Sequence, residues 1–318
     1  MKRRPVVALA GGVGAARFLD GLTRVIAPEC VYIIGNTADD AEIHGLHISP
    51  DLDTVTYTLA GWANPEHGWG IRGDSFRCLE ALGRLGADTW FQLGDLDLAT
   101  HLYRTERLRQ GATLSDVTQE ITRALRVRSK LVPMSNQRVR TRICTRSGEL
   151  EFQDYFVKRR ARDRVTAVRF DGASEATPAP GLLDAVEKAE AIILCPSNPF
   201  ISIGPILAIP GIRAALRRKR DKVAAISPIV GGNALKGPAA KMMQSMYRKA
   251  SAADVAKLYM DFSGVFVLDQ VDRAQASEVA ALHMRTVVTN TIMTGLRERK
   301  NLARVVLREL GIRMENAA

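Results

Sequence analysis

The feature that most constrains the fold of this chain is a glycine turn between a strand-like and a helix-like segment. Residues 6–22, VVALAGGVGAARFLDGL, predict a buried strand, a turn with Gly11, Gly12 and Gly14, and a helix. Glycine permits unusual dihedrals and close backbone approach, and the free N–H groups of a helix N-terminus attract anions. The turn therefore predicts either a phosphate or nucleotide site or only a tight packing contact, since the Lys-Ser/Thr of a P-loop is absent.

Strand-like and helix-like segments continue to alternate after this turn. We expect strands at 5–10, 30–36, 90–94, 191–199 and 222–230, and helices at 15–26, 53–61, 75–86, 114–127, 181–190 and 212–220. This alternation predicts an α/β fold with a doubly wound, Rossmann-like, mostly parallel sheet.

The middle of the chain has a different pattern. Residues 138–160 alternate apolar and polar side chains around a Ser-Gly turn, which predicts a β-hairpin. We expect a Rossmann-like nucleotide-binding core at 1–128 and 176–318, interrupted by a smaller insertion with this hairpin and a helical part at 129–175.

Composition and charge exclude several classes of protein. The 318 residues are 46% hydrophobic, enough for a substantial core, and no apolar run approaches the ~20 residues of a bilayer span. The N-terminal segment lacks the long apolar core of a signal peptide, so we expect no membrane partner and a cytoplasmic location. The net charge of +11 is compatible with nucleic acid, with an anionic metabolite or with a generally basic proteome. Because aromatic residues do not interleave with the basic clusters, we expect no nucleic acid.

The loop after the second expected strand carries clustered aspartates. Residues 35–59 bring together Asp39, Asp40, Asp51 and Asp53, with Asn36 and Thr37 beside them. Clustered carboxylates repel one another unless a cation or a proton is shared. Mg²⁺, which keeps several waters and bridges to phosphate oxygens, would satisfy them. The alternative for Asp51 or Asp53 is a helix N-cap, a position that aspartate favours.

Polar residues also follow two later strand-like segments. The segment LGDLDLATHL at 93–102 carries Asp95, Asp97 and His101, and CPSNPFISIGPIL at 195–207 carries Ser197 and Asn198. Ligands of doubly wound folds bind beyond the carboxyl ends of the strands. We therefore expect the loops at 11–17, 35–40, 94–101, 196–204 and 227–237 to meet at one edge. Helix capping, a structural histidine and a plain tight turn are the alternatives at these positions.

No nucleophile motif accompanies these loops: the sequence has no GxSxG and no cysteine with an evident histidine partner. Phosphoryl transfer, in contrast, needs mainly positioning, a metal ion and positive charge. The loops supply residues of those kinds.

Six segments together resemble the 2-phospho-L-lactate transferase family of coenzyme F-420 biosynthesis. They are GGVGAARFLDGL, GNTADDAEIHGLHISPDLDTVTYTLAG, WGIRGDSF, LGDLDLATHL, PSNPFISIGPIL and SPIVGG, spread over about residues 6–240. The resemblance implies transfer of a phospholactyl-type group from a guanosine diphosphate conjugate to the terminal ribityl hydroxyl of the deazaflavin Fo, with release of GMP. The donor's three-carbon acid, 2-phospholactate, phosphoenolpyruvate or 3-phosphoglycerate, stays open. A homodimer is also implied.

The resemblance further implies roles for individual residues. It places the magnesium ligand at Asp39, and we add Asp53 of the PDLDT segment as a nearby second acid. The proton acceptor stays open among Asp39, Asp40 and Asp53. The expected substrate-binding residues are Gly11, Gly12, Gly14, Arg17, Asn36, Thr37, Asp95, His101, Ser197 and Asn198. Candidates to cover the deazaflavin ring are Trp69, Phe76 and Trp90, each with a core role as the alternative.

Two rival functions come from other classes. A related family of nucleotide-sugar-binding regulators linked to gluconeogenesis shares the glycine turn and the PSNP loop but needs no catalytic acid. A nucleic-acid binder would explain the charge alone. The PDLDT segment and the acidic loop at 94–101 favour the enzyme.

Overall fold

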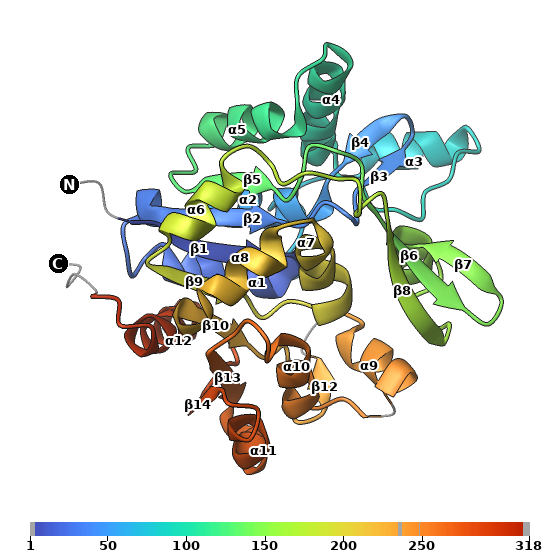
Figure 1. Cartoon of the computed structure of the whole chain (residues 1–318). Helices are drawn as coiled ribbons and strands as arrows, with labels where there is room; N and C mark the ends of the chain where they lie inside the picture. The colour runs from blue at the N-terminus through green and yellow to red at the C-terminus, as the bar shows by residue number, and fades with distance from the viewer. Residues whose placement is uncertain (1–3, 235–236, 248, 314–318) are drawn as a thin grey trace.

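A computed structural model describes residues 4–234, 237–247 and 249–313. Within these residues seven parallel strands form the main sheet in the order β14-β13-β10-β9-β1-β2-β5 (Figure 1). The strands are β1 Val6–Ala10, β2 Val31–Gly35, β5 Lys130–Pro133, β9 Ala191–Leu194, β10 Val223–Ile226, β13 Val265–Asp269 and β14 Arg285–Thr289. The predicted α/β class with a mostly parallel sheet is confirmed.

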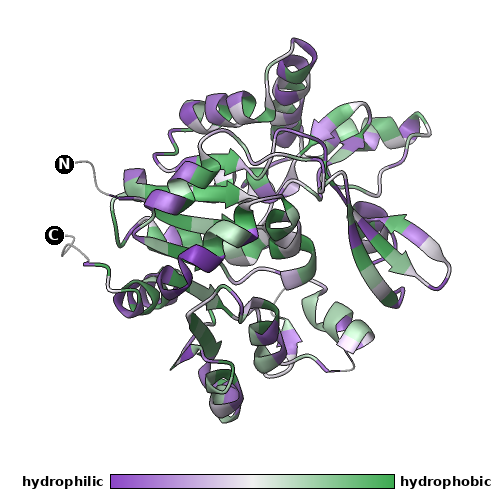
Figure 2. Ribbon diagram, in the orientation of Figure 1, coloured by the Kyte–Doolittle hydropathy of each residue, from purple (hydrophilic) through white to green (hydrophobic). Residues whose placement is uncertain are grey.

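Helices cover both faces of this sheet. Every residue of β1 is buried, as a parallel sheet covered on both sides requires. Alternate side chains serve different cores: Val7 and Leu9 face one cluster, and Val6, Ala8 and Ala10 face the other. Figure 2 shows the resulting hydrophobic strands, with polar residues on the helices around them.

The α-helices have the following bounds. They are α1 Gly12–Leu22, α2 Pro50–Leu59, α3 Arg77–Arg84, α4 Asp95–Arg109, α5 Leu114–Ala124, α6 Leu182–Lys188, α7 Gly204–Ala208, α8 Ile212–Arg218, α9 Ala239–Tyr247, α10 Ala252–Tyr259, α11 Ala276–Ala280 and α12 Leu296–Glu309. Short 3-10 turns lie at Pro28–Cys30, Arg220–Lys222 and Gln270–Gln275, and π-helical turns at Asp154–Lys158 (η2) and Pro199–Ile203 (η3). Helices α1, α2 and α12 share one apolar cluster, and α6, α8 and α10 share the other.

Small antiparallel sheets project from this core. They are β3 Ala41–Ile43 with β4 Leu46–Ile48, β11 Ile229–Val230 with β12 Asn233–Ala234, and the three-stranded sheet of β6 Arg140–Thr145, β7 Gly148–Glu151 and β8 Val165–Asp171. The predicted hairpin at 138–160 is confirmed as β6 and β7. Its final residues form η2 instead of continuing the strand, and β8 was not expected.

One predicted strand is wrong. Residues 90–94 form no strand, and the place beside β2 is taken by β5, which lies inside the range predicted as an insertion. A short apolar run does not by itself distinguish a buried strand from another packed segment. Trp90 and Phe91 are only partly buried and pack edge to face on each other. β13, β14 and α12 complete the core in the C-terminal part, where no elements were predicted.

No single helix among the described residues is both long and apolar enough to cross a bilayer. The segments Pro199–Ala208 and Ile212–Arg218 reach that length and composition only together, with an 89° bend between them. Their apolar side chains belong to a core cluster of the sheet.

Candidate active site

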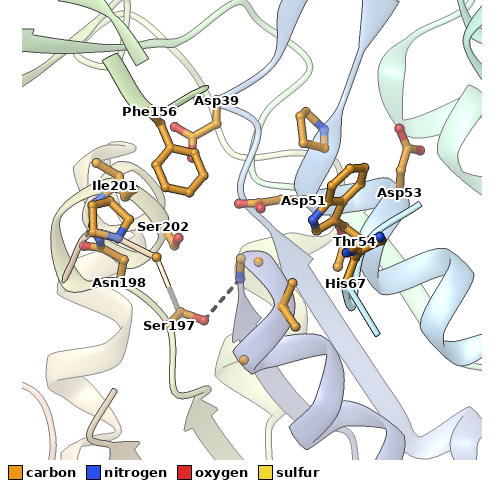
Figure 3. A pocket seen from close by; sticks show the side chains of 18 of the residues that line it. Asp39, Asp51, Asp53, Thr54, His67, Phe156, Ser197, Asn198, Ile201 and Ser202 are labelled. Carbon is orange, nitrogen blue, oxygen red and sulfur yellow. Dashed lines mark hydrogen bonds between the residues drawn. The ribbon is translucent and has the colours of Figure 1, made fainter. Parts of the chain in front are cut away.

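A cavity of about 750 Å³ opens where the parallel strands end (Figure 3). Each of the five loops expected to meet at this edge contributes to its wall. The predicted site residues on the wall are Gly11, Gly12, Gly14, Arg17, Asp39, Asp53, His101, Ser197 and Asn198. The remaining ones, Asn36, Thr37, Asp40 and Asp95, are not among its lining residues.

The glycine turn makes close packing contacts and also lines the cavity. A Cβ atom on Gly14 would collide with the carbonyl oxygen of Pro196, and one on Gly11 would lie 2.6 Å from the carboxylate of Asp51. The backbone N–H of Gly12, at the start of α1, donates to Asp51. A carboxylate therefore already occupies the anion-attracting end of this helix.

Asn36 positions that carboxylate. Its Nδ2 donates to Asp51 Oδ2 at 2.9 Å and to the carbonyl oxygen of Ile201 at 3.1 Å, and its Oδ1 accepts from the Ala38 N–H at 3.0 Å. Because Asn36 is fully buried and its amide is engaged, it acts on a ligand only through Asp51. The sequence weighed Asp51 only as part of the acidic loop and as a helix cap, so this role was missed.

Asp39 and Asp51 both line the cavity wall, and no cation among the described residues compensates their charge (Figure 3). We call them the unpaired acid pair. Burial raises the pKa of Asp51 to about 6, although the hydrogen bonds from Asn36 and Gly12 act to lower it. Burial, followed by the charge of Asp51, raises the pKa of Asp39 well above its ordinary value. Asp39 Oδ1 has no hydrogen-bond partner in the part of the chain that the structure describes. Two buried carboxylates without a cation are costly, so the pair is suited to bind one.

This donor set fits magnesium. Mg²⁺ commonly takes one or two protein carboxylates and completes its shell with waters and substrate phosphates. The described residues contain no group of three or more His, Cys, Asp or Glu arranged for a metal. A site built on this pair would therefore leave several positions for water or phosphate oxygens.

Asp53 belongs to a different group, the paired acid cluster of Asp53, Asp97, His101 and Arg104 together with Tyr57. The buried Arg104 guanidinium donates to both carboxylate oxygens of Asp53, and His101 Nδ1 lies 3.8 Å from Asp53 Oδ2. Burial raises the pKa of Asp53, although the charges of Arg104 and His101 oppose this. Figure 3 shows Asp53 apart from Asp39 and Asp51.

Asp97 completes the paired acid cluster. Tyr57 Oη donates to Asp97 Oδ1 at 2.6 Å, and His101 Nε2 lies 3.2 Å from Asp97 Oδ2. Burial raises the pKa of Asp97, but the hydrogen bonds and charge of His101 and the Tyr57 hydroxyl outweigh it, so the pKa is lowered. The sequence missed Arg104, although its spacing from Asp97 and His101 places all three on one face of α4.

Asp40 and Asp95 serve the local fold. Asp40 Oδ2 accepts from Ser49 Oγ at 2.8 Å and lies 2.9 Å from His47 Nε2, which fixes the β3–β4 hairpin. Asp95 accepts from the backbone N–H groups of Arg77 and Cys78 at the start of α3. Asp95 therefore caps the N-terminus of α3, which agrees with the alternative of helix capping given for this residue.

The PSNP loop is fixed by its own side chains. Ser197 Oγ accepts from the Gly11 N–H at 3.4 Å. Asn198 Oδ1 caps the π-helical turn η3 by accepting from the Phe200 N–H at 2.9 Å, while its Nδ2 lies 3.7 Å from the sulfur of Met242. Both side chains stay on the wall; Asn198 Oδ1 already accepts from two N–H groups, whereas the Ser197 hydroxyl keeps its own O–H donor for a ligand.

Aromatic side chains line two parts of the cavity wall. Of the three aromatic candidates only Trp69 lines the cavity, and its ring stacks on His67 with centroids 5.4 Å apart. Phe152 and Phe156, the latter on η2, also line it and stack at 5.4 Å. The sequence missed Phe156 because its segment was assigned to a hairpin strand.

Comparison with known proteins covers nearly the whole chain. The family described as 2-phospho-L-lactate transferase CofD matches residues 6–306, well past the range near 240 where the resemblance weakened. The 2-phospho-L-lactate transferase of Methanosarcina mazei is 38% identical over 302 residues, covering 95% of this chain and 99% of the relative. That of Methanothermobacter thermautotrophicus is 39% identical, covering 96% and 98%.

Two further proteins extend the comparison. The phosphoenolpyruvate transferase of Streptomyces griseus is 41% identical over 310 residues, covering 95% of this chain and 97% of the relative. A solved structure of a UPF0052 family member from Bacillus halodurans superimposes with a TM-score of 0.65 at 16% identity, covering 96% of this chain and 99% of that one. The latter shows a shared fold.

Proposed function

Because the chain belongs to the 2-phospho-L-lactate transferase family and is therefore a transferase, we propose that it moves a phospholactyl-type group from a guanosine diphosphate conjugate to the ribityl hydroxyl of Fo. The observation that carries the proposal is the unpaired acid pair on the wall of a cavity of about 750 Å³. A buried pair of this kind suits a reaction that brings a diphosphate and its divalent cation into the site.

The reaction exchanges one bond at phosphorus for another. The ribityl oxygen attacks the phosphorus that carries the three-carbon ester, the bond from that phosphorus to the bridging oxygen breaks, and the electron pair leaves with GMP. The hydroxyl proton passes to an aspartate. Of the three candidates, Asp39 and Asp53 line the cavity and Asp40 does not, so we propose one of the former two as the acceptor.

Asp39 and Asp51 would hold the magnesium ion, with Asp51 replacing the Asp53 of the sequence-based prediction. Asp53 is less suited because Arg104 already compensates its charge. Magnesium would neutralise the diphosphate and favour departure of GMP. Asn36 and the Gly12 N–H keep Asp51 oriented for this task.

The donor acid is not decided by the comparisons, because relatives named for 2-phospho-L-lactate and for phosphoenolpyruvate are 38% and 41% identical to this chain. We propose to incubate the protein with Fo, Mg²⁺ and the lactyl, enolpyruvyl or glyceryl donor in parallel, and to identify products by mass spectrometry. We expect GMP and one preferred phosphodiester product. Nucleotide-sugar binding without GMP release from any donor would favour the regulator instead.

The finer predictions on assembly and location belong to this proposal. A homodimer is expected from the resemblance, and sedimentation of the purified protein tests it. A cytoplasmic location and the absence of a nucleic-acid partner likewise stay predictions.

A further inference from the structure

Arg17 is a cation on the cavity wall for which the described residues supply no counter-charge. It lies on α1, is partly buried, and makes no hydrogen bond or ion pair with any residue in 4–234, 237–247 or 249–313. Burial lowers the pKa of its guanidinium, and the charge of Arg299 lowers it further. A partly desolvated guanidinium favours an anion, and because Arg17 lines the cavity, a ligand bound there could supply one.

The nearest acid on its own helix is already engaged. Asp20 lies three residues after Arg17, a spacing at which helical side chains meet. Its Oδ1 accepts from Arg24 Nε at 3.0 Å, and its Oδ2 accepts from Arg299 Nη1 at 2.9 Å. Both carboxylate oxygens of Asp20 therefore already accept hydrogen bonds from other arginines.

Arg299 is held in this place by helix packing. It lies on α12, which packs along α1, and a Cβ atom on Gly21 would collide with the backbone of Arg299. Glycine at position 21 thus lets α12 come close enough for its arginine to reach Asp20.

The cavity wall carries charges of both signs. α1 packs between α2 and α12. Asp51 lies on α2, whereas Arg17 lies on α1 within range of the charge of Arg299 on α12. A diphosphate with one phosphate near the acid pair and its cation would need a second positive group for its other phosphate.

We propose that Arg17 binds the phosphate that departs with the guanosine, and that Arg299 keeps Arg17 available by occupying Asp20. This inference rests on the proposed function for the identity of the leaving group. Arg17 is then a binding residue, and Arg299 is a positioning residue that acts through Asp20.

The test is to measure the affinity for GDP by calorimetry in the absence of Mg²⁺. The variants to compare with the wild type are Arg17→Ala, Arg17→Lys, Arg299→Ala and the double variant Asp20→Asn/Arg299→Ala. We expect Arg17→Ala to weaken binding by roughly 10- to 100-fold, the loss of a charge-assisted contact, and Arg17→Lys to restore part of it. Arg299→Ala frees Asp20 to pair with Arg17 and should weaken binding by a smaller factor. Adding Asp20→Asn should restore it. Arg304→Ala is the matched control, because Arg304 is an exposed arginine of α12 that donates to Asn301 and not to Asp20.

The outcomes separate the two proposals. Unchanged GDP affinity in Arg17→Ala would overturn the role of Arg17. A loss in Arg299→Ala that Asp20→Asn does not restore, at an unchanged melting temperature, would overturn the positioning role. If Arg17→Ala loses GDP while the wild type releases no GMP from any donor, the role of Arg17 stands and the proposed function fails. A wild type that binds neither GDP nor pyrophosphate would overturn both.

Discussion

Asp51 and Asp53 are two residues apart on the same helix, and their surroundings are opposite. Asp53 faces Arg104 in the paired acid cluster, where a guanidinium compensates it. Asp51 faces Asp39 in the unpaired acid pair, where the described residues supply hydrogen bonds but no cation. This difference distinguishes acids that stabilise the fold from acids that are suited to bind a ligand. The useful signal is what neutralises a buried carboxylate, not its position in a motif.

The largest expected effect is on the paired acid cluster. Replacing Arg104 with Ala leaves Asp53 buried without its counter-charge, which should lower the free energy of unfolding by about 3–5 kcal/mol. Urea denaturation measures this. The double variant Arg104→Ala/Asp53→Ala should recover much of the loss, and an equal or greater loss would contradict the assignment of a compensated pair.

Removing Asp39 should lower activity without lowering stability. Asp39→Ala takes away a carboxylate that has no partner on Oδ1, so we expect the melting temperature to hold or rise. GMP release should fall by roughly 10²- to 10³-fold, the usual scale for losing a charge-stabilising group. The exposed acid Asp88, changed to Ala, is the control. Near-normal turnover would remove Asp39 from the metal site.

The pH dependence of stability should also distinguish the two groups. Because the folded pKa of Asp51, about 6, exceeds its ordinary value of 3.8, the folded state holds more protons between these pH values. Without a divalent cation, the contribution of Asp51 to stability should therefore fall as pH rises through this window, by up to about 3 kcal/mol. Denaturation at pH 4 and pH 7 measures it. Other acids whose pKa is lowered, Asp97 among them, add stability as pH rises, so the quantity to compare is the difference between the wild type and Asp51→Asn. That difference should fall with pH, and a difference that stays flat or rises would contradict the unpaired acid pair.

Magnesium should give the smallest of these effects. A cation that binds only the folded state at 100 times its dissociation constant stabilises it by about 2.7 kcal/mol. We expect the melting temperature to rise with added Mg²⁺ in the wild type but not in Asp39→Asn. A full rise in that variant would place the cation elsewhere. Arg104→Ala, despite its lower starting stability, should still respond.

The sequence allowed the fold class and the location of the site to be predicted because both depend on local patterns. Buried strands such as Val6–Ala10, followed by polar loops, indicate a parallel sheet and the edge where ligands bind. Partners within the site depend on contacts between distant segments. Arg104 meets Asp53 across 51 positions, and no local pattern in either segment encodes that pairing.

The same reason explains the remaining errors. Asn36 is engaged by Ile201, 165 positions away, so a residue that resembled a ligand contact proved to be a support. Phe156 reaches the cavity because η2 departs from the strand pattern of its segment. The run at 90–94 has strand-like composition, but the available sheet position went to Lys130–Pro133.

The contact between Gly14 and Pro196 constrains how this protein can change. Gly14 lies in the first turn of α1 and Pro196 in the loop after β9, so both belong to connections that follow the neighbouring strands β1 and β9. The gap between them has no room for a single methyl group. A substitution in one loop that shifts its backbone must therefore be matched by a shift in the other. Anyone redesigning the cavity to accept a different donor would have to vary the two loops as a single unit.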